Sequence, residues 1–239
     1  EPIGQRVQFG VLLGLCRGFT QYGAGFLVAD ANAVETTDYN RATEIRERAL
    51  RMFLRARNYG LRGLELDHKG ITQRLQTSPD LAAGEIKKSE LPMLYWTAAA
   101  WGSAINLGKD RAELLADLGA VRALMTRGLN LDESYEGGAF HEAMILLEAL
   151  PKDMGGSPER ARQHFERAVQ LSKGQKASPY VTLAQSVSVL TQSRKEFHEL
   201  LDKALAVDPN AVPARRLETL IIQQQARDLL KRGLVSADA

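Results

Sequence analysis

The fold is decided by residues 197–209, which read FHELLDKALAVDP. Apolar side chains recur here at positions 197, 200, 201 and 204, and steps of three or four residues are the period of a helix with one buried face. Asp208 and Pro209 follow, and a proline cannot continue a helix because it lacks the backbone N–H and clashes with the preceding turn. The stretch therefore predicts an amphipathic α-helix that ends just before Asp208.

The end of this helix has two earlier counterparts. The order small, aliphatic, any, aliphatic, polar occurs at residues 128–132 (GLNLD), 168–172 (AVQLS) and 204–208 (ALAVD), with starts 40 and then 36 residues apart. Such spacings are typical of proteins built from repeated helix pairs. Small residues let the two helices of a pair cross closely, and a large residue fills the gap to the next pair. The tetratricopeptide pattern of Ala, a large apolar residue four positions later and a small residue three further on occurs at Ala49-Phe53-Ala56 and Ala161-Phe165-Ala168. Phe197-Leu201-Ala204, followed by Pro209, fits the second half of that pattern.

We therefore expect an all-α fold of tetratricopeptide-like helical hairpin repeats, an α-solenoid. It should form one domain over residues 1–239, with long N-terminal helices in 1–75 and repeat-like helix pairs in 90–232. Residues 77–90 are polar and are expected to form a loop. Helix starts are expected at Thr37-Asp38, Ser157-Pro158 and Ser178-Pro179, and helix ends at Gly174 and Gly233. The periodicity predicts helices at 5–33, 38–59, 63–75, 90–107, 110–130, 134–150, 157–172, 179–190, 193–206 and 212–231.

The charge of the chain is balanced. Lys and Arg total 31 against 29 for Asp and Glu, which gives a net charge of +2. This balance argues against nucleic acid or an acidic membrane surface as a partner, and it predicts no basic patch. The one cysteine, Cys16, excludes an intramolecular disulfide and is expected to be a small buried hydrophobic residue rather than a reactive thiol.

The apolar stretch at residues 7–29 has two interpretations. Gln8, Arg17 and Gln21 interrupt it, so its unbroken apolar runs fall well short of the ~20 residues that a spanning helix needs. Glycines recur every fourth residue at positions 10, 14 and 18, which gives a helix one thin face. In a membrane that face would pair with another helix, whereas in a soluble protein it lets a neighbouring helix approach closely. Because Arg17 would be costly in lipid, we favour the soluble interpretation.

No catalytic motif is complete. His141-Glu142 could begin a metalloprotease helix, but the position of the second histidine is Ile145. The four histidines are scattered, and we expect each to be a surface or locally hydrogen-bonded residue rather than a metal ligand. Gly155-Gly156 precedes a helix without the Lys that a phosphate-binding loop requires. We therefore expect no catalytic residues, metal or cofactor, and a protein that is not an enzyme.

Aromatic residues gather on the helix expected at 90–107. Tyr95, Trp96 and Trp101 lie among small residues, and both tryptophans of the chain are in this group. Their separation of five residues places the tryptophans on different faces of the helix. Either one packs in the core while the other lines a groove or contacts a partner, or all three aromatic residues belong to the core.

A series of segments along the chain forms a recognisable order. They are residues 55–64 (RARNYGLRGL), 95–102 (YWTAAAWG), 114–118 (LLADL), 132–135 (DESY), 138–142 (GAFHE), 161–168 (ARQHFERA), 177–181 (ASPYV), 197–201 (FHELL), 206–209 (AVDP) and 216–217 (RL). In this order they resemble a known family, the T component of tripartite ATP-independent periplasmic (TRAP) transporters. The similarity covers nearly the whole chain, although each piece alone is generic helix.

The resemblance implies a periplasmic or lipid-anchored protein that binds the substrate-binding protein of the transporter. It also implies a homotrimer with apolar-lined pores and the handling of hydrophobic, lipid-like ligands. The family has no established catalytic residues to carry over. A lipidation cysteine is absent from the expected place, because Cys16 lies deep in an apolar helix. We expect any anchor or signal peptide to have preceded Glu1.

Two functional hypotheses follow. A transporter accessory that guides an organic acid or hydrophobic solute should have an apolar, aromatic-lined cavity. A plain envelope scaffold that binds peptides should instead have a solvent-open solenoid groove lined by polar residues, with Asn or Arg side chains and no enclosed cavity. The candidate residues for a binding groove or pore are Tyr22, Phe26, Tyr95, Trp96, Trp101, Tyr135 and His141.

Overall fold

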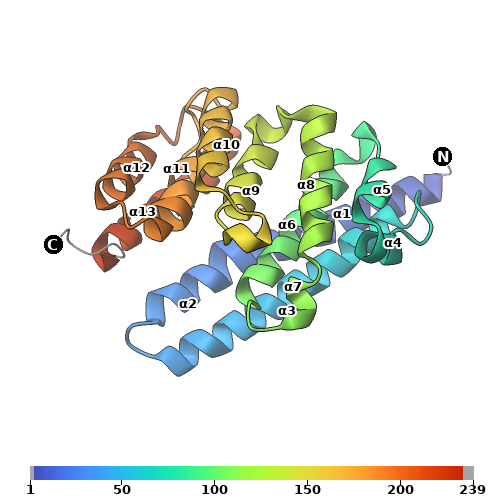
Figure 1. Ribbon diagram of the computed structural model, residues 1–239, viewed down its shortest axis with the longest axis horizontal. Coiled ribbons are helices and arrows are strands. Elements are labelled where there is room, and N and C mark those ends of the chain that lie inside the picture. The colour runs from blue at the N-terminus through green and yellow to red at the C-terminus, as the bar shows by residue number, and fades with distance from the viewer. Residues whose placement is uncertain (1–2, 234–239) are drawn as a thin grey trace. The chain divides into compact units, whose positions relative to one another are not determined.

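The computed structural model describes residues 3–233, and this part of the chain is helical, without β-strands. The prediction of an all-α protein is therefore confirmed (Figure 1). The helices are α1 Ile3–Tyr22, α2 Val28–Val34, α3 Tyr39–Leu64, α4 Ile71–Thr77, α5 Pro79–Gly84, α6 Leu91–Leu107, α7 Ala112–Leu115, α8 Leu118–Asp132, α9 Ala139–Glu148, α10 Pro158–Leu171, α11 Ser178–Leu183, α12 Arg194–Ala206 and α13 Arg216–Arg232.

The chain divides into two compact units, one ending at Asp132 and the next beginning at Glu133. Unit 1 contains α1 to α8 and unit 2 contains α9 to α13. The single domain over residues 1–239 stays a prediction.

Unit 1 is built around α3. This helix packs against α1, α2 and α6, and Figure 1 shows it running alongside the α1–α2 segment. The Asp38 side chain caps its start by accepting a hydrogen bond of 2.8 Å from the backbone N–H of Arg41, as the sequence predicted. Apolar side chains then reach the core at helical spacing, with Leu50, Phe53 and Leu64 almost completely buried.

Close helix contacts in unit 1 depend on glycines other than the expected ones. A side chain added at Gly10, Gly14 or Gly18 would meet nothing within 4 Å, so no described helix packs on that face. A Cβ at Gly60 would instead lie 3.0 Å from Cys16 Sγ and 2.9 Å from Thr97 Cβ, where α1, α3 and α6 meet. The predicted break between residues 59 and 63 is wrong: α3 continues through Gly60 to Leu64, and the close packing of α1 and α6 on Gly60 offsets the low helix propensity of glycine.

The α1–α2 segment is the apolar stretch noted in the sequence. A single π-helical turn, Gly23–Leu27, joins the two helices. Over Ile3–Val34 the helix is long and apolar enough to cross a membrane by length and composition alone, although core helices of soluble proteins and signal sequences pass the same test. Cys16 lies on its buried side, where burial raises the pKa of the thiol to about 12, so the thiol is protonated and unreactive at neutral pH.

Unit 2 is a series of short helices in which chain neighbours pack together, from α9 against α10 to α12 against α13. Positions that the repeat pattern assigned to packing are buried, including Ala161, Ala168, Phe197, Leu201 and Ala204. Ser157 caps α10, and Gly174 and Gly233 have positive φ near helix ends, as predicted. The tetratricopeptide-like repeat architecture itself stays a prediction.

Several further boundary predictions are wrong. The helix expected at 63–75 is interrupted between Leu64 and Ile71, where Gly70 is left-handed. The helix expected at 110–130 is two helices, α7 and α8. Residues 77–90 are largely helical, because Pro79 starts α5 and a 3-10 turn, Lys88–Glu90, leads into α6. The helix expected at 134–150 begins only at Ala139, because Glu136, Gly137 and Gly138 all have positive φ. Three consecutive left-handed residues cannot belong to a right-handed helix.

Candidate functional site

Trp101 is a core residue. Its side chain is 1% exposed, and its indole N–H donates a hydrogen bond of 3.0 Å to Asp117 Oδ2. The Arg57 guanidinium lies 5.3 Å from the Trp101 ring centre and 3.5 Å from the same Asp117 oxygen. Trp101 is therefore fixed by its polar end and by its ring face, which makes it a packing residue of unit 1 rather than a contact for ligands.

Trp96 lies in a different environment. It is partly exposed and meets the Tyr95 ring edge-on at 5.2 Å between ring centres. The Arg17 guanidinium of α1 lies 5.5 Å from the centre of the Trp96 ring. One tryptophan is thus in the core and the other reaches the surface, which is the first of the two arrangements expected from their spacing.

Tyr22 and Phe26 form an exposed aromatic pair. Their rings stack at 5.7 Å between centres, and 40% of Tyr22 and 54% of Phe26 are exposed. Exposed aromatic pairs are typical of contact surfaces because they supply apolar area at low cost in side-chain entropy. Of the candidate residues in unit 1, this pair and the Tyr95–Trp96 pair are the ones able to contact a partner.

The two remaining candidates belong to unit 2. Tyr135 packs against the buried ring of Phe140 at 5.5 Å between ring centres, and His141 is itself buried. The seven predicted residues are therefore divided between the units, five in the first and two in the second. Their role as a binding groove or pore stays a prediction.

His141 is the centre of a polar cluster in unit 2. His141 Nδ1 lies 2.8 Å from His164 Nδ1, and His141 Nε2 lies 3.2 Å from Glu133 Oε2. Arg167 binds both carboxylate oxygens of Glu133. Burial lowers the pKa of His141, against the hydrogen bond that His141 donates to Glu133, which raises it. Neutral His141 donates its Nε2–H to Glu133 and accepts the Nδ1–H of His164, because each ring nitrogen is then satisfied.

This cluster predicts a loss of stability in mild acid. A lowered pKa means that folded His141 resists the proton that the unfolded histidine accepts near pH 6.5, so stability falls as the pH drops through that value. The pKa of the Glu133 carboxyl group is lowered to about 2, first by Arg167 and then by His141. The stability that this ionised carboxylate contributes is therefore lost only in stronger acid, well below the pH at which the unfolded histidine takes up its proton. Urea unfolding at about pH 7.5 and about pH 5.5 should show the loss, and His141→Asn should reduce it. An equal loss in both proteins would contradict the assignment.

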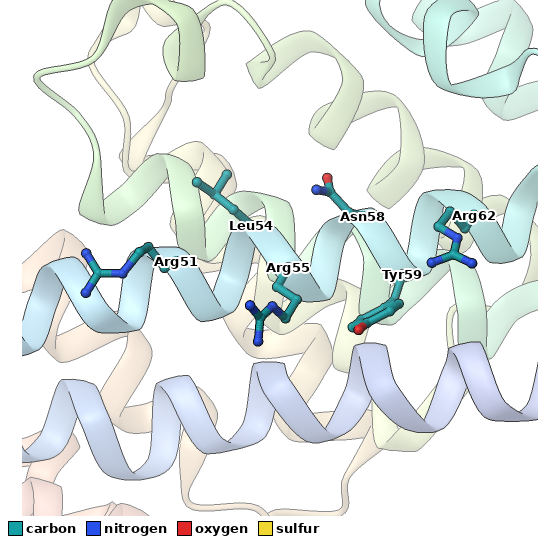
Figure 2. Close-up of a pocket in the computed structure, with 6 residues that line it drawn as sticks. All are labelled: Arg51, Leu54, Arg55, Asn58, Tyr59 and Arg62. Atoms are coloured by element: carbon teal, nitrogen blue, oxygen red, sulfur yellow. The ribbon is translucent and has the colours of Figure 1, made fainter.

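An open groove follows the outer face of α3. It has a volume of about 460 Å³ and is lined by Arg51, Leu54, Arg55, Asn58, Tyr59 and Arg62. Figure 2 shows Arg55 and Tyr59 extending from α3 toward α1. Our sequence reasoning missed this groove, although arginines at steps of three, four and seven residues along one helix were a signal that could have revealed it.

A second hollow lies in unit 2, with a volume of about 210 Å³. Arg162 and Glu196 form a bidentate ion pair at its wall, with oxygen–nitrogen distances of 2.9 and 3.0 Å. None of the seven predicted site residues lines either hollow. The other residues around this one are Phe165, Glu166, Leu183, Glu199, Leu200 and Lys203.

Metal ligands do not cluster within residues 3–233: no group of three or more His, Cys, Asp or Glu side chains could hold an ion there. His68, buried like His141, instead pairs with Glu90 at 2.9 Å. The expectation of hydrogen-bonded histidines is therefore confirmed for His68, His141 and His164.

Comparison with known proteins identifies the family of this chain and a relative. The family model described as TRAP transporter T-component matches residues 6–233. A protein of Treponema pallidum (strain Nichols), itself described as uncharacterized, is 25% identical over 223 residues, which cover 91% of this chain and 69% of the relative.

Proposed function

The chain belongs to the TRAP transporter T-component family, and from this membership we propose that it is a periplasmic accessory subunit that binds the substrate-binding protein of such a transporter. The observation that carries the proposal is the extent of the family match, residues 6–233, which leaves no room for a separate functional domain within the described chain. The family is a transport component and not an enzyme family. The apolar N-terminal helix is compatible with membrane anchoring or a signal sequence.

The contact surface we assign to this function is the pair Tyr95–Trp96 on α6. Aromatic residues carry a large share of the binding energy in protein interfaces, and Trp is the most enriched. Trp96 is partly exposed and is held in place by Arg17 and Tyr95, so it needs little ordering when a partner binds. Binding of a hydrophobic or organic-acid solute and assembly as a homotrimer are further parts of this proposal, implied by the family resemblance.

Replacing Trp96 by alanine should weaken binding of the substrate-binding protein by tenfold or more, because central interface aromatics cost ~2 kcal/mol or more when truncated. A pull-down with a candidate periplasmic binding protein, followed by a titration, measures this. Tyr39→Ala is the matched control, since Tyr39 is an aromatic residue that is 70% exposed on α3. Unchanged binding in the folded Trp96 variant, or an equal loss in the control, would count against this surface.

A second function is favoured by the shape of the hollows. Both described hollows are open and lined by charged residues, with Arg and Asn side chains in the α3 groove, as expected of a scaffold that binds peptides without handling a solute. The hollow in unit 2 offers Arg162, Glu196 and Lys203 beside Phe165, a mixture suited to an extended polar peptide. If the chain binds peptides in this hollow and does not bind the substrate-binding protein, that result would favour the scaffold function.

A further inference from the structure

The arginines of this protein are segregated on one part of unit 1. Residues 3–29 and 48–64 together contain seven arginines and neither Asp nor Glu, which leaves 24 basic against 29 acidic residues in the rest of the chain. These two segments lie on α1 and α3, which pack against each other. The even charge balance led us to expect no basic patch, and the packing of α1 on α3 contradicts that expectation.

Four of these arginines form a row along one exposed face of α3. Arg48, Arg51, Arg55 and Arg62 follow one another at helical spacing, and all four are exposed. Elsewhere in unit 1, Arg46 pairs with Glu35 and Arg57 with Asp117. Among the residues that the structure describes, no carboxylate pairs with any of the four in the row. Uncompensated guanidinium groups at such density repel one another unless an anion binds.

Aromatic rings hold the row in position against α1. The Arg55 guanidinium lies 5.7 Å from the centre of the Phe19 ring, and Phe19 stacks on Tyr59 at 5.9 Å. Arg62 lies 5.9 Å from the centre of the same Tyr59 ring. Figure 2 shows Arg55 and Tyr59 on the side of α3 that faces α1. The contacts with Phe19 make the arginine row continuous with the surface of α1.

The neighbouring face of α1 is apolar and open. Ile3 is 83% exposed, Val7 61% and Val11 56%, at steps of four residues that place them on one helix face. The glycines at positions 10, 14 and 18 lie among them with nothing within 4 Å. Gln5 on this part of α1 donates a hydrogen bond of 2.9 Å to Asp67, so the apolar residues lie beyond the Arg62 end of the row and extend it lengthwise. Exposed apolar side chains and a row of arginines are the two features of segments that lie in the plane of a membrane interface.

We propose that this α1–α3 surface docks on an anionic phospholipid bilayer, with Arg48, Arg51, Arg55 and Arg62 binding lipid phosphates and Ile3, Val7 and Val11 entering the apolar boundary. Arginine suits phosphate because its planar fork donates two hydrogen bonds at once. An acidic protein or a nucleic acid would also neutralise the four arginines. Neither of them explains why Ile3, Val7 and Val11 are exposed on the same surface. The inference goes beyond the proposed partner binding, which uses Trp96.

The test is co-flotation of the full chain with vesicles. The protein should bind vesicles of phosphatidylglycerol and phosphatidylcholine in equal parts, and should bind phosphatidylcholine vesicles far less. Each basic residue near an anionic surface contributes about fivefold, so the triple variant Arg51→Gln, Arg55→Gln, Arg62→Gln should lose on the order of 100-fold in affinity. Raising the salt from about 0.1 M to about 1 M should release the wild-type protein, because screening then acts within ~3 Å.

A matched control removes the same charge elsewhere. Arg194, Lys195 and Arg227 are exposed residues of unit 2, and their triple replacement by glutamine should leave vesicle binding within about twofold. The double variant Val7→Ser, Val11→Ser should weaken binding while the salt dependence remains, since it removes apolar contact only.

Three results would overturn the proposal. The first is that wild-type protein ignores anionic vesicles. The second is that both charge variants lose binding equally. The third is that an acidic peptide or single-stranded DNA binds in an arginine-dependent way while vesicles do not, which would assign the row to that ligand instead. Binding of the substrate-binding protein by the same arginine variant, measured in parallel, separates a failure of this inference from a failure of the proposed function.

Discussion

Replacing Trp101 by alanine will destabilise unit 1 by about 3–5 kcal/mol, the usual cost of removing a fully buried large aromatic side chain. The indole ring is 1% exposed and lies under the Arg57 guanidinium, so the cavity left behind has few ways to close. Asp117 would also lose the hydrogen bond from the indole N–H and keep only Arg57 and Gln76 as partners. Urea unfolding followed by circular dichroism measures the change.

Trp101→Phe separates the two parts of this effect. Phenylalanine keeps most of the apolar volume but cannot donate to Asp117, so the expected cost is smaller, about 1–3 kcal/mol. Trp96→Ala is the matched control because Trp96 is partly exposed on the same helix, and it should cost less than either. A Trp101→Ala protein as stable as the wild type would show that Trp101 is not a core residue.

The second large effect is expected at Gly60. In Gly60→Ala the new methyl group would contact Thr97 and Cys16 at less than van der Waals distance, at the point where three helices meet. Thr97 cannot turn away freely, because its hydroxyl donates a hydrogen bond of 2.6 Å to the backbone carbonyl of Met93. We expect a loss of about 2–3 kcal/mol, at the upper end of what overpacked cores show.

Gly14→Ala is the matched control for this substitution. Gly14 is also inside a helix, but a methyl group there would meet nothing within 4 Å. Because alanine favours the helix over glycine by up to ~1 kcal/mol, this variant should be slightly more stable than the wild type. Thermal unfolding of both variants measures the difference. If Gly60→Ala were also stabilising, the close contact of α1, α3 and α6 would be wrong.

Local signals in the sequence predicted local structure well. Asp38 and Ser157 cap their helices, and Gly174 and Gly233 have the left-handed conformation expected near a helix end. These features depend on a few neighbouring residues, so a single sequence is enough to recognise them. The apolar period likewise identified the buried positions of α10 and α12, such as Ala161 and Phe197.

Features that depend on tertiary packing could not be predicted in the same way. The sequence pattern at Gly10, Gly14 and Gly18 is more regular than that around Gly60, yet Gly60 is where helices meet. A glycine that permits close approach differs from an exposed one only in what lies opposite, and that residue, Thr97, is far away in the chain.

The candidate site likewise combines a feature that the local sequence predicted with features that depend on tertiary packing. The spacing of Trp96 and Trp101 predicted that they face different ways, but which of them is buried depends on Arg57 of α3 and on Asp117 in the turn between α7 and α8. The arginine row was hidden by the net charge, because acidic residues elsewhere in the sequence cancel it in the sum. The nearest carboxylates on α3, Glu44 and Glu47, pair with Arg41 and Arg111 instead of with the row.

The most direct test of the proposed function is a calorimetric titration of the full chain with the substrate-binding protein of a TRAP transporter from the same organism. We predict a saturable one-site interaction with a dissociation constant in the micromolar range or tighter, about −8 kcal/mol or more favourable, that Trp96→Ala weakens. The absence of heat and of complex formation at about millimolar concentrations of the folded proteins would contradict it.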